Sequence, residues 1–193
     1  MSGLLLRGTD LNTLPVVGID AGEALADVKD VVYSAERGAL LGFTLNKRGF
    51  LKGPMKEVLA YGDVVAIGRD AVMVASSSAV TKAAETLSAV VDESGGRNVL
   101  GNDVLTDGGQ RLGTVIDVVV EVTTGEVVGY ELIGDEALQA HAGRPLLIPI
   151  PATLAVSGSV LMVPVAVEPF IRDDLSGFGA AVDEFRGQLP QEA

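Results

Sequence analysis

Alternating apolar and polar positions run through several short stretches of this chain, as is typical of β-strands that cover a core with one face. In residues 41–45, Leu41, Phe43 and Leu45 alternate with a glycine and a threonine, and residues 128–132 repeat the alternation. Short valine-rich runs between glycine-containing turns predict further strands. These further predicted strands cover residues 28–33, 64–67, 71–75, 114–122, 146–150 and 160–165.

One sequence pattern occurs twice, at a spacing of 87 residues. Residues 20–45 align without gaps with residues 107–132, and ten of the 26 positions are identical. The identities include Asp and Gly positions, which a chance similarity between two apolar strands would not match. Each copy consists of an Asp-x-Gly turn, a strand, a glycine turn and a second strand, which predicts a β-hairpin. We therefore expect a duplicated structural unit.

The second strand of each predicted hairpin has a clear core face. Its inward side chains are expected to be Leu41, Phe43 and Leu45 in the first copy, and Val128, Tyr130 and Leu132 in the second. Gly42 and Gly129 then fall on the opposite face, where a strand glycine marks a bulge or a close approach of another backbone. A strongly bent hairpin of this kind suits closure into a small barrel.

Two other stretches have the period of an amphipathic helix. The first follows Ser76–Ser78, which are suited to cap a helix from Ala79 to about Val91 that Gly95 and Gly96 then stop. The second follows Asp173 and Asp174, although Gly177 and Gly179 favour a later start. Its apolar residues are Ile171, Leu175, Phe178, Val182, Phe185 and Leu189. The chain is thus expected to divide into residues 1–92 and 96–193, each a small barrel followed by a helix.

Composition and charge exclude several kinds of site. The 193 residues contain no cysteine and one histidine, His141, so thiolate chemistry and an intrachain histidine cluster are both excluded. The net charge is −12: residues 1–95 carry 9 basic and 12 acidic side chains, and residues 96–193 carry 5 and 14. So acidic a surface repels nucleic-acid phosphates, and no direct binding of nucleic acid is expected.

The chain shows no targeting or membrane signal. No apolar run approaches the ~18 residues of a membrane-spanning helix. The apolar run Leu4–Leu6 near the start is too short for a signal peptide. We expect no membrane span and a cytoplasmic location.

The duplicated motif resembles the PRC-barrel domain, a family named for the cytoplasmic domain of the photosynthetic reaction-centre H subunit. Both copies contain Leu-(Gly/Ala)-x-Val-x-Asp-Val-Val, followed by Gly-x-(Leu/Val)-(Leu/Val)-Gly-(Phe/Tyr). Residues 47–52 and 63–74 are similar to the usual ending of stand-alone PRC barrels, whereas the second copy departs after Ile133, with residues 134–143 in place of the basic loop. The resemblance implies a mainly β chain with two tandem PRC-type barrels.

What the resemblance implies about function is limited. Members of this family share a fold but no catalytic reaction, and some are docking modules for an electron-transfer complex, a ribosomal protein or the cell-division machinery. We therefore expect a non-enzymatic protein-binding or adaptor module without cofactor or metal, whose partner is unidentified. The alternative is an assembly factor linked to the ribosome or to RNA processing, by similarity to the C-terminal domain of a ribosome maturation factor. It would act through a protein contact.

Candidate catalytic groups are few. Asp30 and Asp117 occupy equivalent positions, as do Asp20 and Asp107, and paired carboxylates serve acid–base chemistry or cation binding. Turn and strand-end aspartates more commonly accept hydrogen bonds from nearby backbone amides, which a duplicated hairpin needs in both copies. His141 has no nucleophile motif beside it, so no catalytic residue is assigned.

Two segments are candidate partner-binding surfaces. The basic loop Lys47, Arg48, Phe50, Leu51 and Lys52 combines positive charge with apolar side chains on an acidic chain. It could instead pack on its own barrel, or meet the acidic second half of another copy and form a homo-oligomer. The C-terminal helix, with Phe178, Val182 and Phe185, either closes its own barrel or docks a partner.

Overall fold

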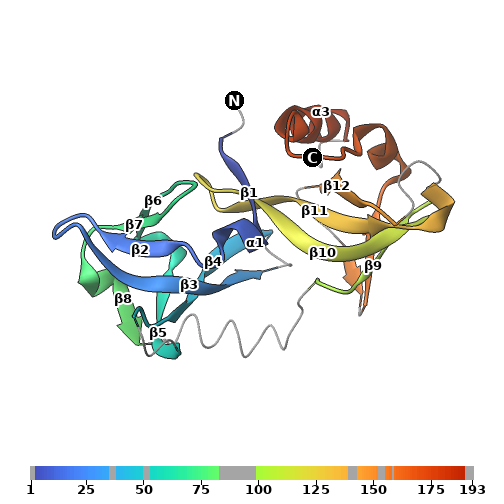
Figure 1. Ribbon diagram of the computed structural model, residues 1–193. Coiled ribbons are helices and arrows are strands. Elements are labelled where there is room, and N and C mark those ends of the chain that lie inside the picture. The colour runs from blue at the N-terminus through green and yellow to red at the C-terminus, as the bar shows by residue number, and fades with distance from the viewer. Residues whose placement is uncertain are drawn as a thin grey trace.

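The computed structural model describes residues 3–34, 38–49, 53–82, 99–138, 143–151, 155–157 and 159–189. The strands of these residues form one 14-stranded sheet that consists of two curled parts, here called the first and the second sheet, which lie side by side and join through β4 (Ala39–Asn46) and β11 (Glu126–Gly134) (Figure 1). The prediction of a mainly β chain with a tandem arrangement is confirmed. The predicted division at residues 92–96 lies outside the described residues and stays a prediction.

The first sheet follows the predicted hairpin and adds strands on both sides of it. Its order is β6-β7-β2-β3-β4-β5, and β2 and β7 are parallel while the other neighbours are antiparallel. Its elements are β2 (Pro15–Gly18), β3 (Glu23–Ser34), β4 (Ala39–Asn46), β5 (Pro54–Ala60), the 3-10 helix η1 (Tyr61–Asp63), β6 (Val64–Ile67) and β7 (Val72–Val74).

The second sheet repeats this order, as the sequence duplication requires. It runs β13-β14-β9-β10-β11-β12, with β9 and β14 parallel. Its elements are β9 (Asp103–Thr106), β10 (Arg111–Glu121), β11 (Glu126–Gly134), η3 (Glu136–Leu138), β12 (Pro145–Pro149), β13 (Ala155–Ser157), β14 (Val160–Val163) and η4 (Val165–Phe170). The two halves therefore have equivalent topologies.

The halves meet through the turns of the duplicated hairpins. The amide of Leu40 donates to the carbonyl oxygen of Gly125 at 2.6 Å, and the amide of Val127 donates to the carbonyl oxygen of Gly38 at 2.8 Å. Since Leu40 and Val127 are equivalent positions, as are Gly38 and Gly125, the junction has approximate twofold symmetry. A segment of the first half also crosses it: β1 (Leu5–Arg7) pairs with β10, and α1 (Gly8–Leu11) follows.

The prediction of which side chains of β4 and β11, the second strand of each hairpin, face the core is partly wrong. In β4 the register shifts by one residue at Leu41, and in β11 it shifts at Val128, so each strand carries a bulge at the equivalent position. The side chains that precede the bulges, Leu40 and Val127, therefore enter the main core. Val128 lies instead in a second, smaller cluster on the other face. A bulge reverses the inside–outside alternation, which the sequence pattern does not reveal.

The interpretation of the strand glycines is confirmed. A Cβ atom on Gly42 would lie 2.2 Å from the carbonyl oxygen of Leu59 in the neighbouring strand β5. A Cβ atom on Gly129 would lie 2.5 Å from the carbonyl oxygen of Ile148 and 2.5 Å from Cζ of Phe178. Both strands thus need glycine because other groups approach their backbone closely.

The predicted helices differ from the observed elements. Ser76 caps only the short 3-10 helix η2 (Ser77–Ala79), and the chain continues as β8 (Val80–Lys82), which pairs with β5. The predicted start of a helix at Ala79 is wrong, because strand pairing satisfies this backbone; the rest of that prediction lies outside the described residues. The C-terminal helix α3 (Phe178–Gln188) forms, and it starts late, after Gly177. No helix of the described residues is long and apolar enough to cross a membrane.

Candidate functional site

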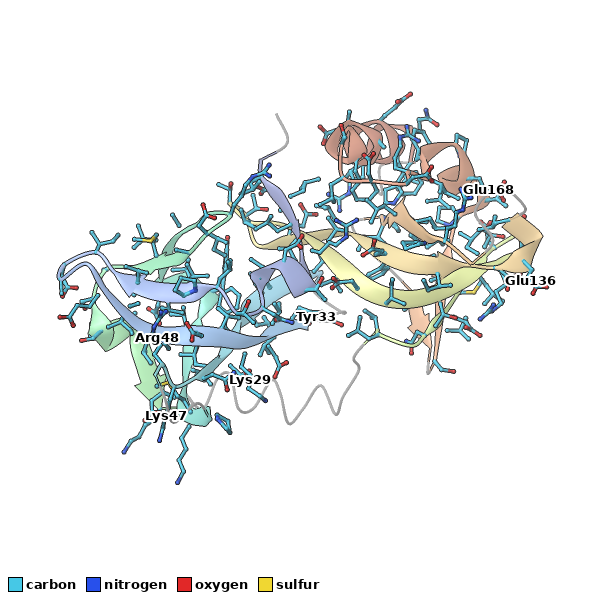
Figure 2. The ribbon with its side chains drawn as sticks, in the orientation of Figure 1. Lys29, Tyr33, Lys47, Arg48, Glu136 and Glu168 are labelled. Carbon is cyan, nitrogen blue, oxygen red and sulfur yellow. The ribbon has the colours of Figure 1, made fainter. Side chains whose placement is uncertain are left out.

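The basic loop leaves the end of β4 at the outer end of the first half. The amide of Lys47 donates to the carbonyl oxygen of Gly53 at 2.9 Å, and the Lys47 side chain is exposed and points away from the sheet (Figure 2). Arg48 is engaged within the chain, since its Nη1 lies 2.7 Å from Oδ1 of Asp27. The other three members of the predicted surface, Phe50, Leu51 and Lys52, lie outside the described residues.

Two more lysines extend the charge of this loop. Lys56 is exposed on β5, and Lys82 is exposed on β8, opposite Glu57 in the β5–β8 ladder. Neither these two nor Lys47 forms an ion pair with a described residue. We call Lys47, Lys56 and Lys82 the cationic end. Among the described residues beside it, Glu57 is half-buried and Asp27 is paired with Arg48, so its local charge is positive.

The far end of the second half has the opposite character. Glu136 on η3 and Glu168 on η4 are exposed at the end of the molecule that lies farthest from Lys47 (Figure 2). We call Glu136 and Glu168 the acidic end. Beside it, Arg111 pairs with both Asp135 and Asp103, the second at 2.6 Å, and its hydrogen bond lowers the pKa of Asp103.

The candidate residues of the C-terminal helix are not exposed. Phe178 and Phe185 are fully buried, and the exposed fraction of Val182 is 4%. Phe178 and Val182 cover Val128 on one face of the second sheet, and the Phe185 ring packs on Phe170 with centroids 5.6 Å apart. The helix therefore closes its own half, the alternative that sequence reasoning left open, and it offers these three side chains to no partner in this structure.

The duplicated aspartates have structural roles that differ between copies. Asp117 is buried and accepts hydrogen bonds from the amide of Thr9 at 3.1 Å and from its hydroxyl at 2.6 Å. Its equivalent Asp30 is exposed and pairs with Lys29. Asp20 accepts from the next amide in its turn, and Asp107 accepts from the amide of Val165. Each carboxylate therefore serves the local backbone or a neighbouring cation rather than a carboxylate pair.

Contacts across the junction include charged and aromatic groups that the sequence did not single out. Arg7 at the end of β1 forms two hydrogen bonds with the buried Glu131 of β11, and this hydrogen bonding raises the pKa of Arg7. The hydroxyl of Tyr61 donates to the carbonyl oxygen of Val122 at 3.0 Å. The sequence analysis predicted no strand at the apolar run before Arg7, and no sequence pattern identifies β10 as the strand with which it pairs.

Clefts flank the strand β1 on both sides. One of about 300 Å³ lies between β1, the β10–β11 turn and α3, and one of about 710 Å³ lies between β1, the start of α3 and Arg69. A groove of about 350 Å³ separates β6 from Val122 and Thr123. Among the residues that the structure describes, no three Asp, Glu or His side chains are placed to hold a metal ion. His141 lies outside those residues.

Comparisons with known proteins agree with the duplicated topology. No curated protein matches the chain. The PRC-barrel domain matches it twice, over residues 5–80 and residues 91–167, and these ranges together cover more than half of the chain. The equivalent strand orders of the two sheets fit this repeated match. The chain therefore belongs to the PRC-barrel domain family, of which it contains two tandem copies.

Proposed function

We propose that this chain is a cytoplasmic, non-enzymatic protein-binding module that docks an acidic segment of a partner protein on its cationic end. The observation that carries the proposal is the state of Lys47, Lys56 and Lys82. All three are exposed, and none forms an ion pair with a described residue, on a chain of net charge −12. Exposed lysines are ordinarily solvated, and what supports docking is that three of them lie on neighbouring strands and one adjoining loop, where the local charge is positive.

The size of the partner segment follows from electrostatic screening. At physiological ionic strength charges interact over about 8 Å, so a short acidic segment senses the local lysines more than the distant carboxylates. A long nucleic acid would also meet the acidic remainder of the surface and be repelled. This favours an acidic protein segment over RNA or DNA as the occupant.

The two ends of the molecule support an adaptor role in addition to simple binding. The acidic end, Glu136 and Glu168, lies opposite the cationic end, and the paired hairpin turns hold the two halves together. A chain with oppositely charged ends on a fixed frame can hold two different partners at a set separation. The proposal assigns no catalytic residue and no cofactor.

A second candidate uses the acidic end. An assembly factor linked to the ribosome or to RNA processing would dock a basic ribosomal protein on Glu136 and Glu168, which are exposed and form no ion pair with a described residue. This function requires co-sedimentation with ribosomal subunits, and that co-sedimentation should depend on the two glutamates and not on the lysines.

The test is capture of partners from the native host with three forms of the chain. The wild type is compared with Lys47→Glu/Lys56→Glu and with the control Arg69→Glu, which reverses an exposed cation on the β6–β7 turn. We expect a protein with an acidic segment that the wild type and the control retain and that the double variant binds at least about tenfold more weakly. Equal retention by all three forms contradicts the use of the cationic end.

A further inference from the structure

We infer that copies of this chain bind one another head to tail, with the cationic end of one copy against the acidic end of the next. The inference rests on the proposed function, because it names the partner of the same cationic end. It is carried by the relation between the two repeats and by the placement of their exposed charges.

The segments that leave the two equivalent hairpins carry opposite charges. The gapless alignment of the repeats ends within β4 and β11, and the segments that follow these strands differ: Lys47 and Arg48 follow β4, whereas Asp135 and Glu136 follow β11. The first repeat therefore leaves its hairpin with Lys47 and Arg48, and the second leaves it with two carboxylates. The two ends are therefore complementary in the sign of their charge.

The approximate twofold symmetry of the junction keeps these surfaces apart within one chain. Ala39 and Glu126 form the bridge between β4 and β11, and both strands start there. Because the bridge is antiparallel, β4 runs away from it in one direction and β11 in the other. Lys47 and Glu136 consequently lie at opposite ends of the molecule, as Figure 2 shows. One chain cannot pair its own ends, but each end can meet the opposite end of another copy.

Exposed apolar side chains accompany the acidic end. Ile133 is 38% exposed next to Gly134, and Ile116 is 41% exposed on the neighbouring strand β10. The equivalent positions of the first repeat hold Asn46 and Lys29. The fold thus accepts polar side chains at both positions, and folding alone does not account for the isoleucines. They add apolar contact to the charge complementarity of the acidic end.

One cation opposes this contact. Arg144 is exposed, and its carbonyl oxygen accepts a hydrogen bond from the amide of Gly134, which places its backbone beside a residue that lies two positions before Glu136 in the sequence. Its charge offsets part of the carboxylate charge. Replacement of Arg144 by glutamine should therefore strengthen the association, a change opposite in sign to that of the other substitutions.

A contact between two different surfaces has a signature that a symmetric dimer lacks. A chain with Lys47→Glu/Lys56→Glu keeps a normal acidic end, and a chain with Glu136→Lys/Glu168→Lys keeps a normal cationic end. Each variant alone is expected to stay monomeric. The first variant has two acidic ends and the second has two cationic ends, so an equimolar mixture should again form dimers and longer species. A chain with all four substitutions should also associate again, through reversed charges.

The measurement is sedimentation velocity of the full chain at physiological salt, from micromolar to near-millimolar concentration. We expect the wild type to form dimers and longer species, the two variants to associate at least about tenfold more weakly, and the control Arg69→Glu to behave as the wild type. A wild type that stays monomeric at every concentration overturns the inference, as does a dimer that both variants retain. If the wild type is monomeric and an acidic partner is still captured through Lys47 and Lys56, only the self-association fails and the proposed function stands.

Discussion

Arg7 and Glu131, 124 positions apart in the chain, form two hydrogen bonds of 2.8 and 3.0 Å across the junction of the two halves. Glu131 is 8% exposed, so its carboxylate depends on Arg7 for the compensation of its charge. The pair fixes β1, a strand of the first repeat, on the sheet of the second.

Loss of Arg7 should destabilise the fold. Arg7→Ala leaves the buried carboxylate of Glu131 without its partner, and we expect a loss of about 2–3 kcal/mol in the free energy of unfolding. Urea unfolding followed by circular dichroism measures it. Arg69→Ala removes an exposed cation that forms no ion pair with a described residue and should change stability by less than about 0.5 kcal/mol. Equal effects of the two substitutions would refute the structural role of the pair.

Gly42 and Gly62 are a matched pair of alanine substitutions. In Gly42→Ala the new Cβ would lie 2.2 Å from the carbonyl oxygen of Leu59, and the backbone ladder between β4 and β5 must move. We expect a loss of about 3 kcal/mol in the free energy of unfolding. A Cβ on Gly62 meets no atom within 4 Å, so Gly62→Ala should be nearly neutral. Thermal unfolding of both variants measures this difference in stability. A Gly42→Ala chain as stable as the wild type would contradict the close approach of the Leu59 carbonyl oxygen to Gly42.

The three tyrosines make stability sensitive to alkaline pH. Burial raises the pKa of Tyr130 to about 12, and burial also raises the pKa of Tyr33 and Tyr61 above the ordinary value of about 10. Above pH 10 the unfolded tyrosines ionise first, so the unfolded state binds fewer protons and stability falls as pH rises. For Tyr130 the loss is about 2–3 kcal/mol between about pH 10 and pH 12.

Two measurements test the role of the tyrosines: tyrosinate absorbance as a function of pH, and the free energy of unfolding as a function of pH. The chain contains three tyrosines and no tryptophan, so tyrosinate absorbance reports these residues alone. The native chain should titrate at higher pH than the urea-unfolded chain. Tyr130→Phe should flatten the alkaline loss of stability, and phenylalanine fits because Phe43 occupies the equivalent position. Coincident titrations of the native and unfolded chains would contradict the assigned burial.

Substitution of Phe178 tests whether α3 is part of the core or a docking element for a partner. Its ring is fully buried against the second sheet, so Phe178→Ala should cost about 3–4 kcal/mol and increase amide exchange throughout α3. Glu184→Ala, an exposed change on the same helix, should leave both stability and exchange unchanged. If Phe178→Ala left stability intact and abolished partner capture, the helix would be a docking element instead.

Local sequence patterns predicted the repeated hairpins and the glycines at Gly42 and Gly129, and the repeat led to the family. These features depend on neighbours within one turn or one ladder, which the order of residues records directly. The C-terminal helix was also recognised from its periodicity, including its late start after Gly177. The basic loop was recognised by charge, but the contribution of Lys82 was not, because the pairing of β8 with β5 brings it beside Glu57 and Lys56.

The amino-acid sequence by itself determined the duplication, the mainly β class and the uneven charge of the two halves. The tertiary structure alone decided that β1 crosses to the second half, that Val128 faces away from Tyr130, and that Phe178 is buried. The physical reason is the range of the interactions concerned. Periodicity reports which side chains share a face of an uninterrupted strand. A bulge interrupts that period, and a crossing strand or a docked helix depends on contacts with residues far along the chain.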